Sequence, residues 1–172
     1  EPLIATEAIE RRVAELAGAI NVRYVDGVSI VAVMTGAIPF VADLMRRLTI
    51  PVTVSVVAAR SYVGTAQRAG DLRMLLPVSA EQVAGQDVLV IDDILDSGQT
   101  LGVLFEDIRA MTPASLAGCV LLRKERPDIP SRIEMDYVGF DIPDAFVVGY
   151  GLDYDGLGRN LPAIYAMPAE PG

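Results

Sequence analysis

The chain has 172 residues, of which 52% are hydrophobic and 22% are charged, with one cysteine and no histidine. This composition excludes a disordered chain and predicts one globular domain over residues 1–172. The net charge of −9 argues against a protein that binds nucleic acid through a basic face. Without histidine, acid–base chemistry falls mainly to carboxylates, tyrosines and the single lysine.

The first half of the chain alternates helical and strand-like segments. Apolar residues at three- and four-residue spacing predict an amphipathic helix that has Thr6 as its N-cap. The segments that follow are expected to be a strand, a helix with proline near its start, and two further strands: 28–34, 37–48, 51–59 and 72–76. Residues 60–71 lack apolar periodicity, which is typical of a hairpin connection or of a mobile lid, and the hairpin is favoured.

The second half continues the alternation. A buried strand over 87–91 leads into a helix over 100–111, and apolar runs at 116–122 and 146–150 predict two more strands. Residues 151–172 are expected to form loops and a final short strand. Strands that alternate with helices, each strand nearly continuous in apolar residues, predict an α/β fold with a mainly parallel sheet flanked by helices.

No segment has the character of a membrane span or a secretory signal. The longest apolar stretch, residues 28–42, is interrupted by Gly36 and Pro39 and is too short to cross a bilayer comfortably. The first ten residues lack the basic region and apolar run of a signal peptide. We therefore expect a cytoplasmic protein.

Three aspartates and a turn follow directly after a buried strand in the stretch VLVIDDILDSGQTL. In an open parallel sheet, ligands bind beyond the carboxyl ends of the strands. Asp92 and Asp93 at such an end can bind sugar hydroxyls or help to hold a hydrated Mg²⁺. A solvated loop with an aspartate N-cap is the structural alternative, but two acids followed by a third favour a binding site.

The turn itself has the composition of a phosphate site. Gly98 permits an unusual backbone conformation, and Ser97 and Thr100 supply hydroxyl groups at the start of a helix. Backbone amides at a helix start attract anions. The stretch is therefore interpreted as a sugar–phosphate site. The glycine-rich fingerprints of nucleotide-binding P-loops and of dinucleotide-binding folds are absent from the sequence.

This stretch closely resembles the phosphoribosyl pyrophosphate (PRPP) motif of the type I phosphoribosyltransferases. Three further segments, in compatible order, are similar to the hypoxanthine-guanine branch of that family: VAVMTGAIPFVADLMRRL to its first pyrophosphate loop, ARSYVGTAQRAGDLRML to its flexible loop, and DYVGFDIPDAFVVGYGLDYDGLGRNLP to its purine-binding region. The resemblance spans roughly residues 28–166. It implies the type I fold, a parallel sheet with a small hood and a flexible loop.

The resemblance also implies an activity. Members of this family transfer ribose 5-phosphate from PRPP to a purine nitrogen and release pyrophosphate. A purine-salvage transferase for hypoxanthine or guanine, giving IMP or GMP, is therefore expected, with Mg²⁺ as cofactor. A xanthine-preferring enzyme and a non-catalytic PRPP-sensing regulator stay as alternatives, although no basic face supports the regulator. A homodimer or homotetramer is expected, without nucleic acid or membrane partners.

The family's roles for PRPP carry over to matching positions. Ribose and phosphate would be bound by Asp92, Asp93, Asp96, Ser97, Gly98, Gln99 and Thr100. Asp96 would also be the catalytic base that takes the purine N7 proton, or would bind that N–H group. Pyrophosphate would contact Thr35, Gly36 and Arg159, and the Thr35–Gly36 peptide is expected to be cis. Mg²⁺ would be held by Asp153, with Asp92 and Asp93.

The family's purine contacts carry over in the same way. Lys124, the only lysine, would donate to the purine 6-oxygen, Phe146 would stack on the base, and Val147 and Asp153 would meet its edge. A lysine donor favours 6-oxopurines over adenine. Ser61 and Tyr62 would form a lid that excludes water.

One position departs from the family. Many members have lysine where this chain has Thr35, and that lysine can reach pyrophosphate or a neighbouring subunit. The threonine side chain is too short for either contact, so only the backbone role is expected here.

Overall fold

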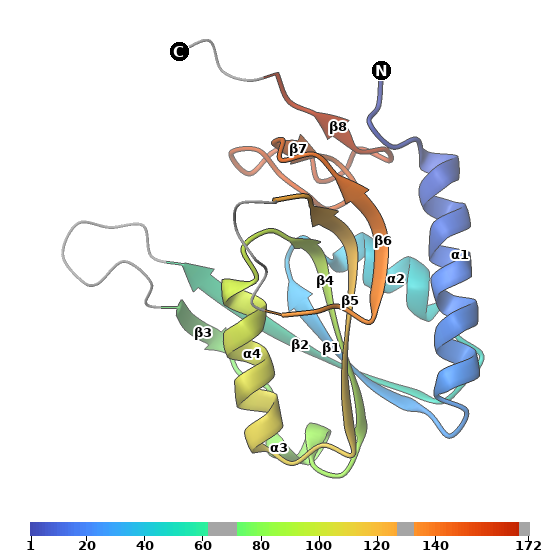
Figure 1. The fold of residues 1–172 in the computed structure, drawn as a ribbon, viewed down its shortest axis with the longest axis vertical. Helices are drawn as coiled ribbons and strands as arrows, with labels where there is room; N and C mark the ends of the chain where they lie inside the picture. Colours follow the sequence, from blue (N-terminus) through green and yellow to red (C-terminus); the bar gives the residue numbers. More distant parts are fainter. Residues whose placement is uncertain (62–71, 127–132, 169–172) are drawn as a thin grey trace, which may run out of the picture.

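The sheet is the central element of the computed structural model, which describes residues 1–61, 72–126 and 133–168 (Figure 1). Six strands are hydrogen-bonded in the order β3-β2-β1-β4-β5-β6. All neighbouring pairs are parallel except β2 and β3, which pair antiparallel at one edge. The strands are β1 (Val28–Met34), β2 (Val52–Ser61), β3 (Leu72–Leu76), β4 (Asp87–Leu95), β5 (Ser115–Lys124) and β6 (Tyr137–Ile142).

Helices cover both faces of this sheet. The helices are α1 (Thr6–Arg23), α2 (Ile38–Met45), α3 (Ala80–Val83) and α4 (Gln99–Ala110). Ile30 and Ala32 of β1 pack in one hydrophobic cluster with α1 and α2, whereas Val31 and Val33 pack in a second cluster with α4. Both faces of the central strands are therefore buried, which explains their continuous apolar runs.

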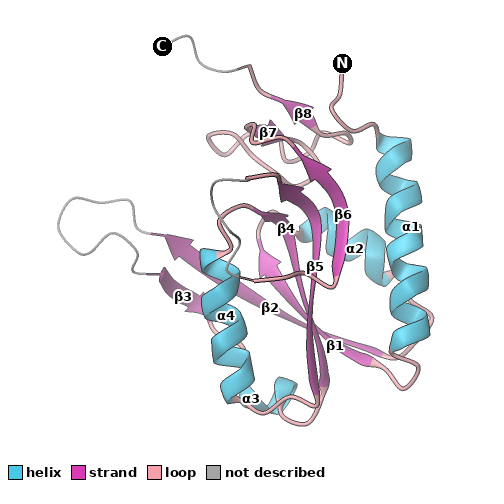
Figure 2. Cartoon of the chain, in the orientation of Figure 1, coloured by secondary structure: helices cyan, strands magenta, loops and turns pink. Residues whose placement is uncertain are grey.

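A small second sheet forms the hood. It consists of β7 (Val147–Val148) and β8 (Tyr165–Ala166), which pair antiparallel. The N-terminal segment joins it through a bridge between Ile4 and Ile164. The hood lies beyond the carboxyl ends of the central strands, so it faces the edge where ligands bind in such sheets (Figure 2).

Several predicted elements are confirmed. β1 and β3 have the expected bounds, and the antiparallel pairing of β2 with β3 confirms the hairpin. The five apolar positions of α1 are all buried: Ile9, Val13, Leu16, Ala17 and Ile20. Residues 60–71 were expected to be a hairpin connection or a lid; Arg60 and Ser61 belong to β2, and residues 62–71 lie outside the described residues.

Other predicted bounds are wrong. Ala5, not Thr6, is the N-cap of α1, because the Ala5 carbonyl accepts the first helical hydrogen bonds from Ala8 and Ile9. The helix expected over 37–48 ends at Met45. The strand expected over 146–150 is reduced to β7, and β6 was not predicted at all.

The most important correction concerns β4. It runs to Leu95 rather than ending at Ile91, because its ladder with β5 continues through the pairs Asp92–Val120 and Leu95–Arg123. Asp92 and Asp93 therefore lie within the strand, not after it. Pairing with a neighbour keeps polar residues in a strand that apolar content alone would end early.

The helices of the described chain include none that is both long enough and apolar enough to cross a bilayer.

Arg12 ties α1 to the edge strand β6. Its Nε donates to the Gly139 carbonyl at 2.8 Å and its Nη2 donates to the Val138 carbonyl at 2.9 Å. A Cβ on Gly139 would lie 2.3 Å from the backbone oxygen of Leu121, so β5 and β6 approach each other too closely there for a side chain. Gly18, in contrast, is an exposed residue of α1 with nothing within 4 Å of an added Cβ.

We expect opposite effects from alanine at these two glycines. Gly139→Ala should lower the free energy of unfolding by about 1–3 kcal/mol, because backbone must move to accept the methyl group. Gly18→Ala, the matched control, should raise it by about 0.5–1 kcal/mol through helix propensity. Urea denaturation measures both values. A Gly139→Ala variant as stable as the unmodified chain would contradict the close approach of β5 and β6.

Candidate functional site

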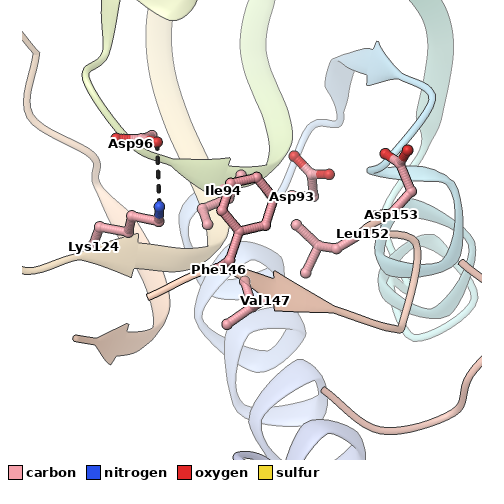
Figure 3. Close-up of a pocket in the computed structure, with 8 residues that line it drawn as sticks. All are labelled: Asp93, Ile94, Asp96, Lys124, Phe146, Val147, Leu152 and Asp153. Atoms are coloured by element: carbon pink, nitrogen blue, oxygen red, sulfur yellow. Dashed lines mark ion pairs between the residues drawn. The ribbon is translucent and has the colours of Figure 1, made fainter. Parts of the chain in front are cut away.

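A cleft lies at the carboxyl ends of β4 and β5, under the hood (Figure 3). Its volume is about 240 Å³, and its lining residues come from segments far apart in the sequence: Asp93, Ile94, Asp96, Lys124, Phe146, Val147, Leu152 and Asp153. Six of these eight residues were predicted as site residues from the sequence; Ile94 and Leu152 were not. The fold therefore brings the third aspartate of the motif, the single lysine and the C-terminal loop together.

A second cavity adjoins the cleft. This loop cavity of about 170 Å³ is formed by the end of β4, the turn and the start of α4, residues 92–101. Gly98 has a φ of 71°, a conformation that favours glycine, and its carbonyl accepts the first hydrogen bond of α4 from Gly102 at 2.8 Å. The turn thus leads the free amides of a 12-residue helix into the cavity. Asp93 and Asp96 line both the cleft and the loop cavity.

Asp92 and Asp93 are carboxylates with little access to water. Burial raises the pKa of Asp92 well above its usual value, and the neighbouring charge of Asp93 raises it further. Burial also raises the pKa of Asp93, and the positive charge of Arg159 offsets part of that effect. The Asp93 amide donates to Asp92 Oδ1 at 2.8 Å. Two adjacent carboxylates, Asp92 buried and Asp93 half-buried, are well suited to accept hydroxyl hydrogens or to face a cation.

The loop after β1 touches these acids. Gly36 is buried, and an added Cβ would lie 1.6 Å from Asp93 Oδ2, so only glycine fits. A Cβ on Gly151 would in turn lie 2.0 Å from the Gly36 carbonyl oxygen. The cis peptide expected at Thr35–Gly36 lies one bond earlier, between Met34 and Thr35. Thr35 itself is exposed at the start of this loop.

Four charged side chains form a closed cluster on one side of the cleft. Lys124 Nζ lies 3.4 Å from Asp96 Oδ2 and 3.3 Å from Asp144 Oδ1. Arg126 Nη1 lies 2.7 Å from Asp96 Oδ1, and its Nη2 lies 2.9 Å from Asp144 Oδ1. We call these four residues the charge cluster. Each acid contacts both cations, so the cluster is neutral as a whole.

Arg126 and Asp144 were missed in the sequence. A signal was present for Arg126, since residues 124 and 126 share one face of an extended chain. Asp144 carried no comparable signal, because its contact depends on the pairing of β5 with the unpredicted strand β6.

Phe146 presents its ring to the cleft. Its residue surface is 61% exposed, whereas composition alone indicated a core residue. Lys124 Nζ lies 5.8 Å from the ring centroid, and the Tyr154 ring meets it edge-on at 5.7 Å between centroids. In Figure 3 the ring lies at the centre of the cleft, between Lys124 and Asp153. An exposed aromatic face at this position can stack on a flat ligand.

Asp153 and Arg159 are paired in the loop after β7. Arg159 Nη2 lies 2.6 Å from Asp153 Oδ1, and its Nη1 donates to the Gly151 carbonyl at 2.6 Å. The second oxygen of Asp153 accepts from the Gly156 amide at 2.8 Å. The pair is thus pre-oriented beside Asp93.

The structure describes only one of the two predicted lid residues. Ser61 ends β2, and Tyr62 lies outside the described residues. Across residues 1–61, 72–126 and 133–168, no group of three or more acids and cysteines is placed to hold a metal ion on its own. Mg²⁺ does not need such a group, since it is usually held by one or two carboxylates together with substrate phosphates.

Comparison with known proteins agrees with this geometry. The family model for the phosphoribosyl transferase domain matches residues 3–155. The chain is 39% identical over 170 residues to a hypoxanthine-guanine phosphoribosyltransferase of Mycobacterium avium, which covers 94% of this chain and 82% of that relative. It is 40% identical over 171 residues to a hypoxanthine phosphoribosyltransferase of Salmonella typhimurium, with coverage of 95% and 93%.

A solved structure shows the same fold. A crystal structure of a hypoxanthine-guanine phosphoribosyltransferase from Bacillus anthracis superposes with a TM-score of 0.87 at 35% identity and covers 98% of both chains. The family model, the relatives and this superposition agree, and the chain belongs to the phosphoribosyltransferase family.

Proposed function

We propose that this chain is a purine-salvage enzyme that transfers the 5-phosphoribosyl group of PRPP to hypoxanthine or guanine. The products are IMP or GMP and pyrophosphate. The observation that carries the proposal is the cleft in which Lys124 and Asp96 lie side by side near the exposed ring of Phe146. The names of the relatives, which act on hypoxanthine or on hypoxanthine and guanine, support the same substrates.

The purine contacts follow from donor and acceptor chemistry. Lysine only donates hydrogen bonds, and an ionised aspartate only accepts them. A 6-oxopurine offers the complementary pair, an oxygen acceptor at position 6 and an N–H donor at N7. Lys124 therefore binds the 6-oxygen and Asp96 faces N7, while Phe146 stacks on the ring and the Val147 backbone meets its edge.

PRPP occupies the loop cavity in this proposal. Asp92 and Asp93 accept the ribose hydroxyls at the end of β4, where the sheet edge is open to ligands. The 5′-phosphate binds the turn and the free amides of α4, through Asp96, Ser97, Gly98, Gln99 and Thr100. The two cavities share Asp93 and Asp96, so the sugar and the base meet at these residues.

In this proposal pyrophosphate lies on the side of Asp93 that faces the loop after β1. The backbone of Thr35 and Gly36 and the guanidinium of Arg159 contact its oxygens. Asp92, Asp93 and Asp153 fit an Mg²⁺ that arrives with the substrate, because each supplies a carboxylate and none forms a closed cage with others. When bound, Mg²⁺ would offset the negative charge that grows on the departing pyrophosphate.

The reaction needs positioning more than covalent chemistry. The bond from the ribose anomeric carbon to a pyrophosphate oxygen breaks, and a bond from that carbon to a purine nitrogen forms. The purine ring gains positive charge as its nitrogen donates an electron pair to that carbon, and Asp96 accepts the N7 proton, which restores a neutral ring. Phe146 and Lys124 hold the base in line, and Ser61 and Tyr62 close over the site to exclude water.

Three further expectations stay predictions. Residues 1–172 act as one phosphoribosyltransferase domain, the active form is a homodimer or homotetramer, and the enzyme works in the cytoplasm. Light scattering of the purified chain measures the oligomeric state directly.

Substrate choice is the first test of the proposal. With PRPP and Mg²⁺, we expect turnover of hypoxanthine or guanine, and kcat/KM for adenine lower by about 10⁴-fold, because adenine places a donor against Lys124. Lys124→Met should lower kcat/KM for hypoxanthine by about 10- to 100-fold, whereas Arg123→Met, whose partner is the exposed Asp141, should leave it unchanged.

Other outcomes are equally clear. Comparable turnover of adenine would contradict the role of Lys124. A clear preference for xanthine would move the assignment to a xanthine enzyme. PRPP binding without turnover of any base would support a regulator instead.

Asp96→Asn tests the catalytic base. The variant keeps the size of the side chain and its place beside Arg126, but it cannot accept the N7 proton. We expect single-turnover transfer to slow by about 10²–10⁴-fold while the Kd for PRPP, measured by calorimetry, changes little. Loss of PRPP binding with an unchanged rate of transfer would assign Asp96 to binding alone.

Asp92→Asn tests the acidic strand end. The pKa of Asp92 is raised in the folded chain. At pH values between the usual aspartate pKa and this raised pKa, the folded chain therefore binds more protons than the unfolded chain. The free energy of unfolding then falls as pH rises across that window. The variant should therefore have a higher melting temperature than the unmodified chain at pH 7, by about 2–4 °C for each kcal/mol of unfavourable charge burial that the change removes. The difference in melting temperature should shrink as pH falls toward 4.

The same variant should bind PRPP about 10- to 100-fold more weakly, since a charged acceptor for ribose is lost. Asp26→Asn, a change at an exposed acid in the turn before β1, is the matched control for both readouts. A lower melting temperature for Asp92→Asn at pH 7 would show that the charge of Asp92 is stabilising in the folded chain.

A further inference from the structure

We propose that Arg126 is a positioning residue for transfer: it fixes the orientation of the Asp96 carboxylate by spanning Asp96 and Asp144. The inference rests on the proposed function for the role of Asp96. It concerns a residue that the sequence motifs did not include, and it assigns to it an effect on rate rather than on substrate binding.

The contacts of Asp96 divide between two different cations. Oδ1 lies 2.7 Å from Arg126 Nη1, within hydrogen-bond range, whereas Oδ2 lies 3.4 Å from Lys124 Nζ. The shorter contact holds one oxygen firmly. The second oxygen is the one on the side of Lys124, where the purine is proposed to bind (Figure 3). Arg126 therefore determines which oxygen is left to meet N7.

Asp144 anchors the guanidinium at its other terminal nitrogen. The contact from Nη2 to Asp144 Oδ1 is 2.9 Å, and this hydrogen bond lowers the pKa of Asp144. A planar guanidinium holds its two terminal nitrogens at a fixed spacing. When Asp144 fixes one of these nitrogens, the direction of the other nitrogen toward Asp96 is fixed as well. The Nε of Arg126 is buried and has no hydrogen-bond partner among the described residues, which leaves the two terminal nitrogens as its polar contacts.

Asp96 needs such a restraint because of its position. Its side chain is 44% exposed and belongs to a turn, and it lines both the cleft and the loop cavity. Rotation about its side-chain bonds would carry the carboxylate from the purine toward the phosphate. Lys124 alone cannot prevent this rotation, since its ammonium is a single point charge shared with Asp144 at a similar distance, 3.3 Å.

Arg126→Met and Arg126→Lys separate orientation from charge. Both should lower kcat for hypoxanthine by about 10- to 100-fold, the scale expected when a reacting group is misplaced. The KM for PRPP should stay within about twofold, because Arg126 does not line the loop cavity. A lysine keeps the charge but cannot span two carboxylates, so it should not restore the rate.

Arg123→Met is the matched control. Arg123 lies in β5, three residues before Arg126, and pairs with Asp141 of β6. Arg126 pairs with Asp144 in the same way, with each partner 18 residues further along the chain. It does not contact Asp96. Arg123→Met should keep the unmodified kcat, and a similar fall in both variants would assign the effect to general destabilisation and overturn the inference. Full activity of Arg126→Lys would assign it to charge alone and also overturn it.

Crystal structures of Arg126→Met and of the unmodified chain provide a readout that needs no turnover. The Asp96 carboxylate should leave its position or occupy several orientations in the variant. A single unchanged orientation would overturn the inference even if the variant were slow. If the unmodified chain transferred no purine, the proposed function would fail, and the structures would still decide whether Arg126 orients Asp96.

Discussion

The parallel pairing of β4 between β1 and β5 is the constraint on which the site depends. Residues Val88–Ile91 of β4 are buried by helices on both faces, so the strand cannot shift without exposing apolar surface on one of them. The same ladder continues through Asp92 to Leu95 and carries two acids to the edge of the sheet. The acids are thus held by the core rather than by a loop.

This placement explains the contrast between the two groups of acids in the site. Asp92 and Asp93 sit at the end of β4 with pKa values raised by burial, an effect that the charge of Arg159 offsets in part at Asp93. Asp96 directly follows Leu95, the last residue of β4, and is held by two cations of the chain itself. In the proposed function the first group meets a cation and hydroxyls, whereas the second group has its charged partners within the chain.

Much of this architecture was predictable from short patterns. The bounds of β1 and β3 could be predicted from their apolar runs, and the turn after β4 from its composition. The family resemblance placed Lys124 and Phe146 in the cleft. Composition alone placed Phe146 in the core, because exposure of an aromatic ring depends on what surrounds it rather than on its neighbours in sequence.

What escaped prediction depends on contacts between distant segments. The end of β4 is set by hydrogen bonds to β5, and β6 is an edge strand whose glycine and aspartate weaken its pattern. Because β6 was not predicted, the sequence did not indicate where the segment from Asp141 to Asp144 lies in the fold. The charge cluster, which includes Asp144, could therefore not be predicted. Arg126 could be seen in the sequence to lie near Lys124, but without Asp144 as its predicted partner no function could be assigned to it.

The contact of Gly36 with Asp93 and Gly151 has a consequence for how the two halves of the site respond to each other. The loop proposed for pyrophosphate and the loop that carries Asp153 are packed backbone to backbone, with no side chain between them to absorb a displacement. There is no room for even a methyl group at the contact, so a shift of one loop toward the other would press on its backbone. Two glycines therefore couple the shape of the loop proposed for pyrophosphate to the shape of the loop that carries Asp153.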